Sequence, residues 1–269
     1  MDYSKKFLVE PGSKVNLKKF DPTETPGFES REEADEITAR NITKMDALQS
    51  LFYADRRYGL LIVLQAMDGG GKDGTVRHVM SGLNPQGVEV TAFKVPSAEE
   101  ADHDYLWRIH HSVPARGDIG IFNRSHYEDV LVTRVHKLIS KDVWQARYEQ
   151  INLFEKYLTD NNIITLKFFL HISNEEQKRR FQQRIDDPKR NWKISSADFS
   201  ERKLWDDYQD AYGDALEKCS TAHAPWYIIP ANNKWFRNLA ISQIILEKLE
   251  SLDLSYPKPL EDLSKIVLV

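Results

Sequence analysis

The sequence predicts an α/β fold, a three-layer sandwich in which helices cover both faces of a parallel sheet. Two observations predict it. Segments with strand and helix periodicity alternate through most of the 269 residues, which is the pattern of parallel strands joined by right-handed crossovers. The segment GLLIVLQA (59–66) is also a continuous apolar run of strand length, as expected of a strand buried on both faces.

The other elements follow in chain order. Prolines and glycines interrupt residues 1–29, so we expect an irregular arm that lies on the body of the protein. Ser30 and Glu33 have the spacing of a capping box, and apolar residues recur at helical spacing after them, which predicts a long helix that ends near Asp55. Further strands are expected at 88–95, 118–123, 162–172 and 226–230, and further helices at 75–83, 97–113, 125–139, 141–161, 174–185, 199–218 and 233–251.

Length and composition bound the function. With 41% hydrophobic residues the chain can bury a full core, and we expect one domain over 30–251 with a lid at about 179–200, followed by a tail over 252–269. The formal charge of −4 gives no global field to recruit nucleic acid or an anionic membrane, so neither is an expected partner. A lone Cys219 excludes an internal disulfide and a multi-cysteine zinc site. With no apolar leader or membrane span, the expected location is the cytoplasm.

A glycine-rich segment follows the first predicted strand. LQAMDGGGKDG (64–74) is close to the phosphate-binding pattern G-x-x-x-x-G-K-[ST], but has Ala66 in place of the first glycine and Asp73 in place of the hydroxyl residue. Such a turn between a buried strand and a helix directs backbone N–H groups and the helix dipole at one anion. Lys72 adds a point charge, and Asp73 suits either support of a metal or the solvated first turn of the helix. The predicted phosphate-binding residues of this segment are Gly69, Gly70, Gly71, Lys72, Asp73 and Gly74.

Asp68 stands inside this predicted anion site. A carboxylate ~4 Å from a phosphate oxygen repels it by about 1 kcal/mol in water and about 4 kcal/mol at an effective dielectric constant near 20. The sequence therefore implies a cation between the two groups. Because Mg²⁺ binds carboxylates together with substrate phosphates, Asp68 would take over the metal-holding role of the missing Ser or Thr.

A second group of polar residues, NRSHYED, follows the predicted strand 118–123. Since the carboxyl ends of parallel strands share one crevice, Asn123, Arg124 and Ser125 are expected beside the glycine-rich loop. The planar guanidinium of Arg124 suits a transferring phosphoryl group, with a surface salt bridge as the alternative. Ordinary P-loop kinases have a metal-orienting Asp at such a strand end; here that place holds Asn123, and Glu128 comes one helical turn later.

Basic residues crowd the segment RRFQQRIDDPKRNWK (179–193), at a proline-marked break between two predicted helices. Lids that close over phosphates carry such arginines, although a charge run on a solvated helix is the alternative. Arg184 is our candidate for contact with the transferring phosphate, and the candidates for nucleotide contact are Arg180, Lys189, Trp192 and Lys193. A scattered set of basic residues lies near the ends of the first three predicted strands and would suit a long polyanion: Arg77, Lys94, Arg108, His110, His111 and Arg116. Of these, Arg77 and Arg108 are the candidates for phosphate binding.

Three segments resemble the second family of polyphosphate kinases, the polyphosphate:nucleotide phosphotransferases: QAMDGGGKDGTVRHVMSGLNPQGVEVTAFKVPS, YLWRIHHSVPARGDIGIFNRSHYEDVLVTRV and RIDDPKRNWKISSADFSER. The resemblance implies a P-loop kinase fold similar to thymidylate kinase, with a helical lid. It also implies reversible transfer of a terminal phosphoryl group between inorganic polyphosphate and a nucleotide, with Mg²⁺ as cofactor. Mn²⁺ is the alternative ion. NRSHYED resembles the subgroup that phosphorylates both nucleoside mono- and diphosphates.

The same resemblance implies roles for individual residues. Asp68 would hold metal, Lys72 and Arg124 would contact the transferring phosphate, and Arg184 would act from the lid. Many members have Asp in place of Asn123, so Glu128 is the candidate for the compensating carboxylate. The predicted metal ligands are therefore Asp68, Asn123 and Glu128.

Two other functions are weighed against this one. An ATP-dependent nucleoside monophosphate or small-molecule kinase could use the same fold, but the lost Ser/Thr and the extended basic set argue against it. A non-catalytic sensor of polyphosphate or nucleotide would be expected to have lost Lys72 or Arg124, and both are present. We expect a homo-oligomer, a dimer or tetramer, although apolar residues around Trp144, Leu153 and Leu158 suit burial in the core as well as a dimer face.

Overall fold

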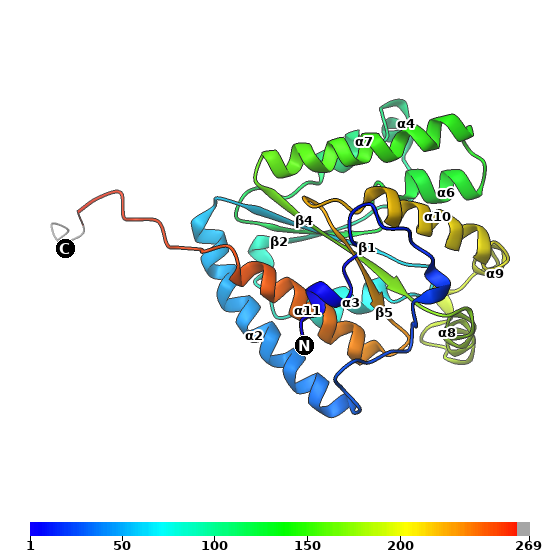
Figure 1. The fold of residues 1–269 in the computed structure, drawn as a ribbon, viewed down its shortest axis with the longest axis horizontal. Helices are drawn as coiled ribbons and strands as arrows, with labels where there is room; N and C mark the ends of the chain where they lie inside the picture. Colours follow the sequence, from blue (N-terminus) through cyan, green and yellow to red (C-terminus); the bar gives the residue numbers. More distant parts are fainter. Residues whose placement is uncertain (263–269) are drawn as a thin grey trace.

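The computed structural model describes residues 1–262. Its centre is a five-stranded parallel sheet in the order β2-β3-β1-β4-β5 (Figure 1). The strands are β1 (Gly59–Gln65), β2 (Val88–Ala92), β3 (Ile119–Asn123), β4 (Ile163–His171) and β5 (Trp226–Pro230). All seven residues of β1 are buried, which confirms the strand expected from its continuous apolar run.

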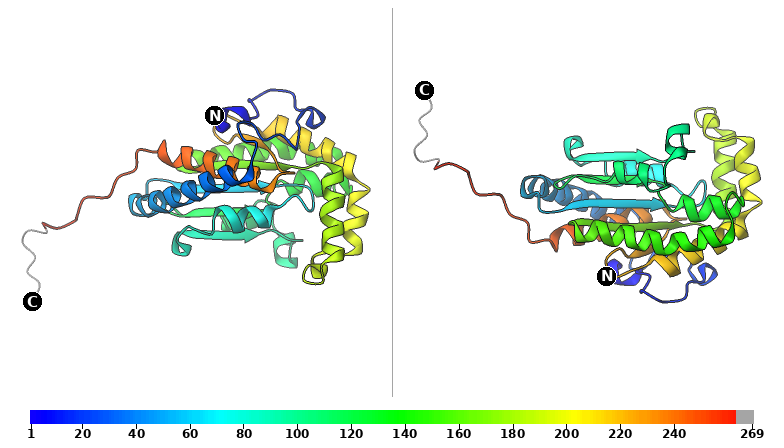
Figure 2. Two further views of the ribbon diagram at one scale, coloured as in Figure 1. Left: turned by 90° about the horizontal axis from the view of Figure 1, so that it is seen from below. Right: turned by 90° about the horizontal axis from the view of Figure 1, so that it is seen from above.

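Helices cover both faces of the sheet, as the three-layer prediction requires (Figure 1). One layer contains α2 (Arg31–Asp55), α3 (Lys72–Val79) and α11 (Lys234–Glu250), and the other contains α6 (Glu128–Val135), α7 (Lys141–Asp160) and α10 (Trp205–Cys219). The shorter elements are α1 (Tyr3–Lys6), η1 (Leu17–Lys19), η2 (Pro85–Gly87), α4 (Ala98–Asp102), α5 (Trp107–His111), α8 (Asn174–Asp186), η3 (Asn191–Lys193) and α9 (Ser196–Arg202). Helices α8 and α9 stand across one end of the sheet (Figure 2).

Strand order decides where a ligand can bind. From β1 the chain crosses to the edge strand β2, returns through β3, and then continues on the other side of β1 with β4. The crevice in such a sheet lies at the carboxyl ends of the strands where the order reverses. Leu64 of β1 is paired with Asn123 of β3, and Arg124 N donates to Leu64 O over 3.2 Å. The segment after β3 therefore begins beside the loop after β1.

Three local expectations were wrong. Ser30 is the N-cap residue of α2, but its side chain makes no capping hydrogen bond. The helix expected at 97–113 is broken into α4 and α5, because the side chain of Asp104 accepts a hydrogen bond from Leu106 N and forms a turn. The helix expected at 199–218 is likewise divided into α9 and α10.

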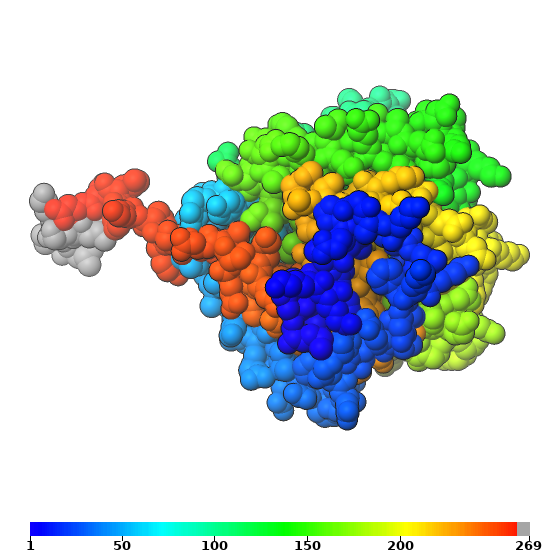
Figure 3. Space-filling view, in the orientation of Figure 1, coloured from blue at the N-terminus to red at the C-terminus, as the bar shows by residue number. Residues whose placement is uncertain are grey.

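The N-terminal arm covers the edge of the sheet beside β5. Val9 N donates to Trp226 O and Ile228 N donates to Phe7 O, each over 2.9 Å, so the arm pairs with an edge strand that would otherwise expose its backbone groups. Phe7 and Val9 are 5% and 4% exposed. In the space-filling view the arm, in dark blue, spreads over the surface between α11 and α10 (Figure 3).

The chain beyond α11 leaves the body of the protein (Figure 1). Of the predicted tail, residues 263–269 lie outside the described part. No helix within residues 1–262 is long and apolar enough to cross a bilayer. On helix α7, Leu158 is buried, Trp144 packs partly against the core and Leu153 is 62% exposed.

Candidate active site

The loop between β1 and α3 is a cradle of backbone groups. It turns sharply after Met67, with Gly70 N donating to Met67 O over 2.9 Å, and helix α3 begins at Lys72. Gly69 and Gly71 have positive φ angles of 78° and 105°, which side-chain-bearing residues rarely adopt. The N-terminus of α3 consequently faces the concave side of the loop, where its dipole favours an anion.

The lack of space behind the loop explains why glycines form it. A Cβ on Gly70 would lie 2.4 Å from the Cβ of Ala66, and a Cβ on Gly71 would lie 2.1 Å from Nη1 of Arg237. The loop is therefore packed tightly from behind.

Gly71→Ala is expected to destabilise the protein by about 2 kcal/mol, because positive φ alone costs an L-residue roughly 1–2 kcal/mol and the new methyl group also meets a buried guanidinium. Thermal unfolding should show a Tm lower by about 4–8 °C, together with a loss of phosphotransfer. Gly12→Ala is the matched control, because Gly12 has a φ of 78° but nothing within 4 Å of its added Cβ. An equal loss in the two variants would show that the contact with Arg237 adds nothing.

Lys72 lies inside the cradle. Its side chain is 9% exposed, and Nζ donates to Ala66 O over 2.9 Å. Burial lowers the pKa of Lys72, and the nearby guanidinium of Arg124 lowers it further. An anion in the loop would relieve both effects, so the ammonium is placed to receive one.

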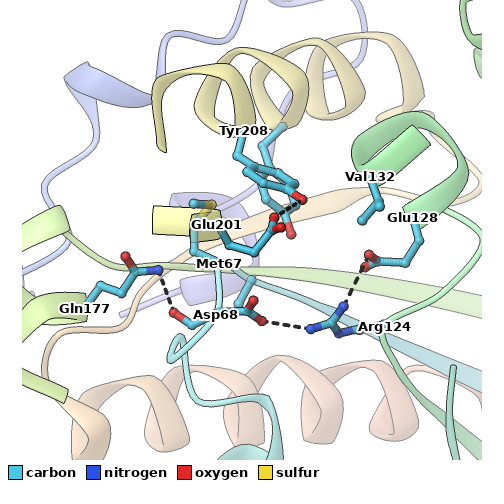
Figure 4. A pocket seen from close by; sticks show the side chains of 10 residues that line it. Met67, Asp68, Arg124, Glu128, Val132, Gln177, Glu201 and Tyr208 are labelled. Carbon is cyan, nitrogen blue, oxygen red and sulfur yellow. Dashed lines mark hydrogen bonds and ion pairs between the residues drawn. The ribbon is translucent and has the colours of Figure 1, made fainter. Parts of the chain in front are cut away.

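Arg124 faces the cradle from the end of β3. It has a φ of 65°, a left-handed conformation of the kind that costs about 1–3 kcal/mol and clusters at functional sites. Its Nη2 donates to Asp68 Oδ1 over 2.8 Å, and its Nη1 lies 3.7 Å from Glu128 Oε2 (Figure 4). Because the three side chains remain between 17% and 40% exposed, the cluster is open to a ligand.

A pocket surrounds this cluster (Figure 4). Its walls come from the end of β1, from α6, and from the helices α8, α9 and α10 that stand across the end of the sheet. The lining residues are Ala66, Met67, Asp68, Arg124, Glu128, Val132, Gln177, Glu201, Tyr208 and Tyr212. The pocket thus sets three carboxylates and two phenols around a single guanidinium.

The predicted metal ligands are only partly brought together. Asp68 and Glu128 both face Arg124, whereas Asn123 Nδ2 donates to Asp73 Oδ1 over 2.8 Å and lowers the pKa of that carboxyl. Among residues 1–262 no group of three or more His, Cys, Asp and Glu side chains could hold a metal. Mg²⁺ needs one or two carboxylates when substrate phosphates supply the other ligands. Asp68 and Glu128 fit that requirement.

The structure also supplies a countercharge for Asp68. A carboxylate beside a bound phosphate needs a cation nearby, and the guanidinium of Arg124 already stands 2.8 Å from Asp68. Arg124 would thus offset part of the repulsion before any metal binds.

Three predicted phosphate-binding residues, Ser125, Arg108 and Arg77, do not line this pocket. Ser125 is fully buried, and its hydroxyl accepts from Gln65 Nε2. Arg108 is 8% exposed and donates to Lys94 O. Arg77 is exposed in the last turn of α3. These positions favour support of the fold for Ser125 and Arg108, rather than direct contact with phosphate.

Arg180 differs most from its expected place in the lid. It is 5% exposed, donates from Nη1 to Gly69 O and Gly70 O over 2.8 and 2.9 Å, and pairs with Glu176 at 2.6 Å. Its guanidinium therefore holds the loop from behind. Glu176, one helical turn earlier, lies on the same face of α8 and pairs with Arg180, and this face packs against the loop.

The other lid candidates lie around η3. Arg184 Nη1 donates to Lys193 O over 3.1 Å, and Lys193 Nζ lies 3.5 Å from Asp73 Oδ2 at the start of α3. Trp192 is 77% exposed and Lys189 is exposed. Lys193 thus connects the lid to the helix that begins at the loop.

Sequence reasoning missed the pocket residues contributed by α8, α9 and α10. Gln177 Nε2 donates to Asp68 O over 2.8 Å, and Arg202 Nη1 donates to Gln177 Oε1 over 2.9 Å, so lid helix α9 is tied to the loop. Tyr208 donates to Glu201 over 2.7 Å (Figure 4). Tyr208 and Tyr212 have helical spacing, but such a pair is equally typical of a buried helix face.

A glycine-rich loop at the switch point of a parallel sheet, with a buried lysine at the helix start and an arginine facing it, defines the class of P-loop phosphotransferases. The chain belongs to one family of that class. The family described as Polyphosphate kinase 2 (PPK2) matches residues 28–256, which confirms the resemblance found in the three segments.

Individual relatives are similar over nearly the whole chain. An AMP/ADP-polyphosphate phosphotransferase of Meiothermus ruber is 49% identical over 98% of this chain and 99% of that protein. An ADP-polyphosphate phosphotransferase of Rhodopseudomonas palustris is 46% identical over 95% and 92%. The crystal structure of polyphosphate kinase 2 from Arthrobacter aurescens superposes with a TM-score of 0.94 at 42% identity, over 98% of this chain and 94% of that one. The protein is accordingly an enzyme, a phosphotransferase of the polyphosphate kinase 2 family.

Proposed function

We propose that the protein transfers the terminal phosphoryl group of inorganic polyphosphate to AMP and ADP, and catalyses the reverse reactions. The observation that carries this proposal is the likeness over almost the full length to a relative named AMP/ADP-polyphosphate phosphotransferase. The site agrees with it, because the loop lacks the Ser/Thr of the ATP-dependent pattern and has Arg124 and Asp68 paired at its mouth.

The chain's own residues would align and neutralise the phosphates, which is most of what phosphoryl transfer requires. The loop 69–71 and the N-terminus of α3 would bind the terminal phosphate. Lys72 and Arg124 would neutralise charge on its equatorial oxygens, and Arg184 would do so from the lid. A deprotonated acceptor phosphate needs no strong general base.

A divalent metal would be held by Asp68 and Glu128, and we propose Mg²⁺, or Mn²⁺ in its place, on the basis of their hard oxygen donors. When bound, it would supply positive charge to the phosphate oxygens of donor and acceptor. Asn123 would contribute only after release from Asp73, to which it donates over 2.8 Å.

The basic residues near β2 suggest a path for the polyphosphate chain. A second pocket at the end of β2 includes Lys94, Arg108 and His111 in its lining, and Phe93 N donates to Asn123 O over 3.2 Å at its edge. A polyanion that ran along this side would reach the loop from β2 across β3. Arg108 would contribute through its charge, since it is 8% exposed.

An assay without ATP tests the function. Purified protein, Mg²⁺ and long-chain polyphosphate are incubated with AMP and, separately, with ADP, and the nucleotides are resolved by chromatography. ADP and then ATP should appear from AMP, and ATP from ADP. Product formed only with ATP as donor would show an ATP-dependent kinase instead, while tight polyphosphate binding without any product would show a sensor.

A further inference from the structure

A second buried arginine lies behind the glycine-rich loop. Arg237 of α11 is 1% exposed, and its Nη1 donates to Gly71 O over 3.2 Å. Its Nε and Nη2 donate to the neutral side chain of Asn238 over 3.2 and 2.7 Å. Within residues 1–262 no carboxylate makes an ion pair with Arg237.

The neighbouring Arg180 shows that a buried arginine here can be neutralised. Arg180 is 5% exposed and pairs with Glu176 at 2.6 Å. Arg237 is instead subject to burial and to repulsion from Arg180, which together lower its pKa to about 9. The guanidinium still carries its charge near pH 7, and burial of an unpaired charge is costly unless another group compensates it.

Hydrogen bonding of the loop does not explain this arginine. The carbonyl of Gly71 already accepts from Thr75 N over 2.9 Å and from Thr75 Oγ1 over 3.2 Å. Asn238 is half-exposed, so water can donate hydrogen bonds to its side chain instead. Both partners would thus have hydrogen bonds without Arg237. What a neutral side chain could not supply at this position is the positive charge.

The guanidinium of Arg237 lies directly against the glycines at the start of α3. Its Nη1 and Nη2 lie 2.1 and 3.3 Å from where Cβ atoms on Gly71 and Gly74 would stand. The guanidinium therefore lies directly behind the residues that begin α3, while the concave side of the loop faces the pocket. Charge at this place adds to the potential that the helix N-terminus directs at a bound anion.

We propose that Arg237 is a positioning residue for the phosphate donor, an uncompensated buried cation whose countercharge is the phosphate bound on the other side of the loop. The inference rests on the proposed function only in that the loop binds phosphate. It assigns the donor's affinity partly to a residue that never touches it, and it accounts for the glycine at position 71, where a side chain would occupy the space of the guanidinium.

The test compares full-length wild type with Arg237→Met and Arg237→Lys. Tm is measured with and without long-chain polyphosphate and with and without inorganic phosphate, and KM for polyphosphate is measured with ADP as acceptor. Arg237→Met should have a Tm without anion equal to or above that of wild type, a clearly smaller rise in Tm with either anion, and a KM at least tenfold higher. Arg237→Lys should keep most of the anion response because it keeps the charge.

A purely structural role gives the opposite pattern. Arg237→Met would then lower the Tm without anion and leave both the anion-induced rise and KM as in wild type, which overturns the inference. Arg179→Met is the matched control, since Arg179 belongs to the same basic group but its side chain is 53% exposed and paired with Glu176. It should respond to both anions as wild type does.

The proposed function can fail separately. A wild type that responds to inorganic phosphate but not to polyphosphate contradicts polyphosphate as donor, while the comparison with Arg237→Met in inorganic phosphate still decides the role of the arginine. A wild type that responds to neither anion overturns both proposals.

Discussion

Asp68→Asn is expected to lower kcat/KM for ADP phosphorylation by polyphosphate at least about a hundredfold, a loss of about 2.7 kcal/mol of transition-state stabilisation. The neutral amide cannot supply the carboxylate oxygen that a divalent metal requires beside the loop. It also leaves Arg124 without the partner that now stands 2.8 Å away. Initial rates at saturating Mg²⁺ measure the loss.

The fold should survive this change. The Asp68 side chain is 33% exposed, and exposed ion pairs contribute only about 0–1 kcal/mol to stability. The backbone contact from Gln177 Nε2 to Asp68 O does not depend on the side chain. Tm should therefore fall by no more than about 4 °C.

Asp73→Asn is the matched control, because Asp73 lies in the first turn of α3 directly after the loop, is 72% exposed, and has Asn123 and Lys193 as partners. It should reduce kcat/KM less than about tenfold, or 1.4 kcal/mol. Retention of more than a tenth of the wild-type rate by Asp68→Asn would remove Asp68 from the metal site. Equal losses in the two variants would place Asp73 in it.

The fold could be predicted because its main signals are local. The apolar run of β1 and the glycines after it describe a strand, a turn and a helix start that depend only on neighbouring residues. Where a short polar contact decides the geometry, the prediction was wrong. Asp104, for instance, accepts a hydrogen bond from Leu106 N and forms a turn, which divides the single helix predicted over 97–113 from hydrophobic spacing alone.

The site was predictable where the chain itself places residues together. Asp68, Lys72 and Arg124 follow neighbouring parallel strands, so sheet topology brings them to one crevice. Gln177, Glu201 and Tyr208 come from helices whose packing over the sheet no local pattern reveals. Arg180 shows the same limit, because its sequence neighbours mark it as basic and surface-exposed while Glu176 and the loop carbonyls hold it inside.

A buried cluster of charged residues next to the segment that carries Arg124 gives the second large expected effect, a loss of stability. Lys167 Nζ of β4 donates to Glu155 Oε2 of α7 over 2.5 Å, to Tyr127 OH over 2.8 Å and to Cys219 O over 2.7 Å. Glu155 Oε1 also accepts from Tyr127 over 2.9 Å and lies 3.2 Å from His126 Nε2. His126 and Tyr127 directly follow Arg124 and Ser125, so the cluster fixes the segment that holds Arg124 at its left-handed φ.

Lys167→Met is expected to destabilise the protein by about 3–5 kcal/mol, because it leaves a fully buried carboxylate without its cation. Burial acts to raise the pKa of Glu155, and Lys167 together with His126 now holds it below its ordinary value. In the variant the folded-state pKa of Glu155 should rise above the unfolded value. The loss of unfolding free energy is then largest above the folded-state pKa and becomes smaller as the pH falls. Urea unfolding at pH 5 and pH 8 measures both the loss and its pH dependence.

Two further variants decide whether charge, rather than volume, causes the loss. Lys167→Met combined with Glu155→Gln removes both charges and should regain more than half of the lost stability, since neutral groups in the same space cost less than one unpaired ion. Lys156→Met is the control. It removes the lysine of an ion pair with Asp160 on α7, the helix that carries Glu155, and both side chains of this pair are 58% exposed. It should lower the free energy of unfolding by less than about 1 kcal/mol. A double variant as unstable as Lys167→Met would mean that Lys167 acts through packing and its contacts with Tyr127 and Cys219, and that the ion pair itself contributes little to holding Arg124 in place.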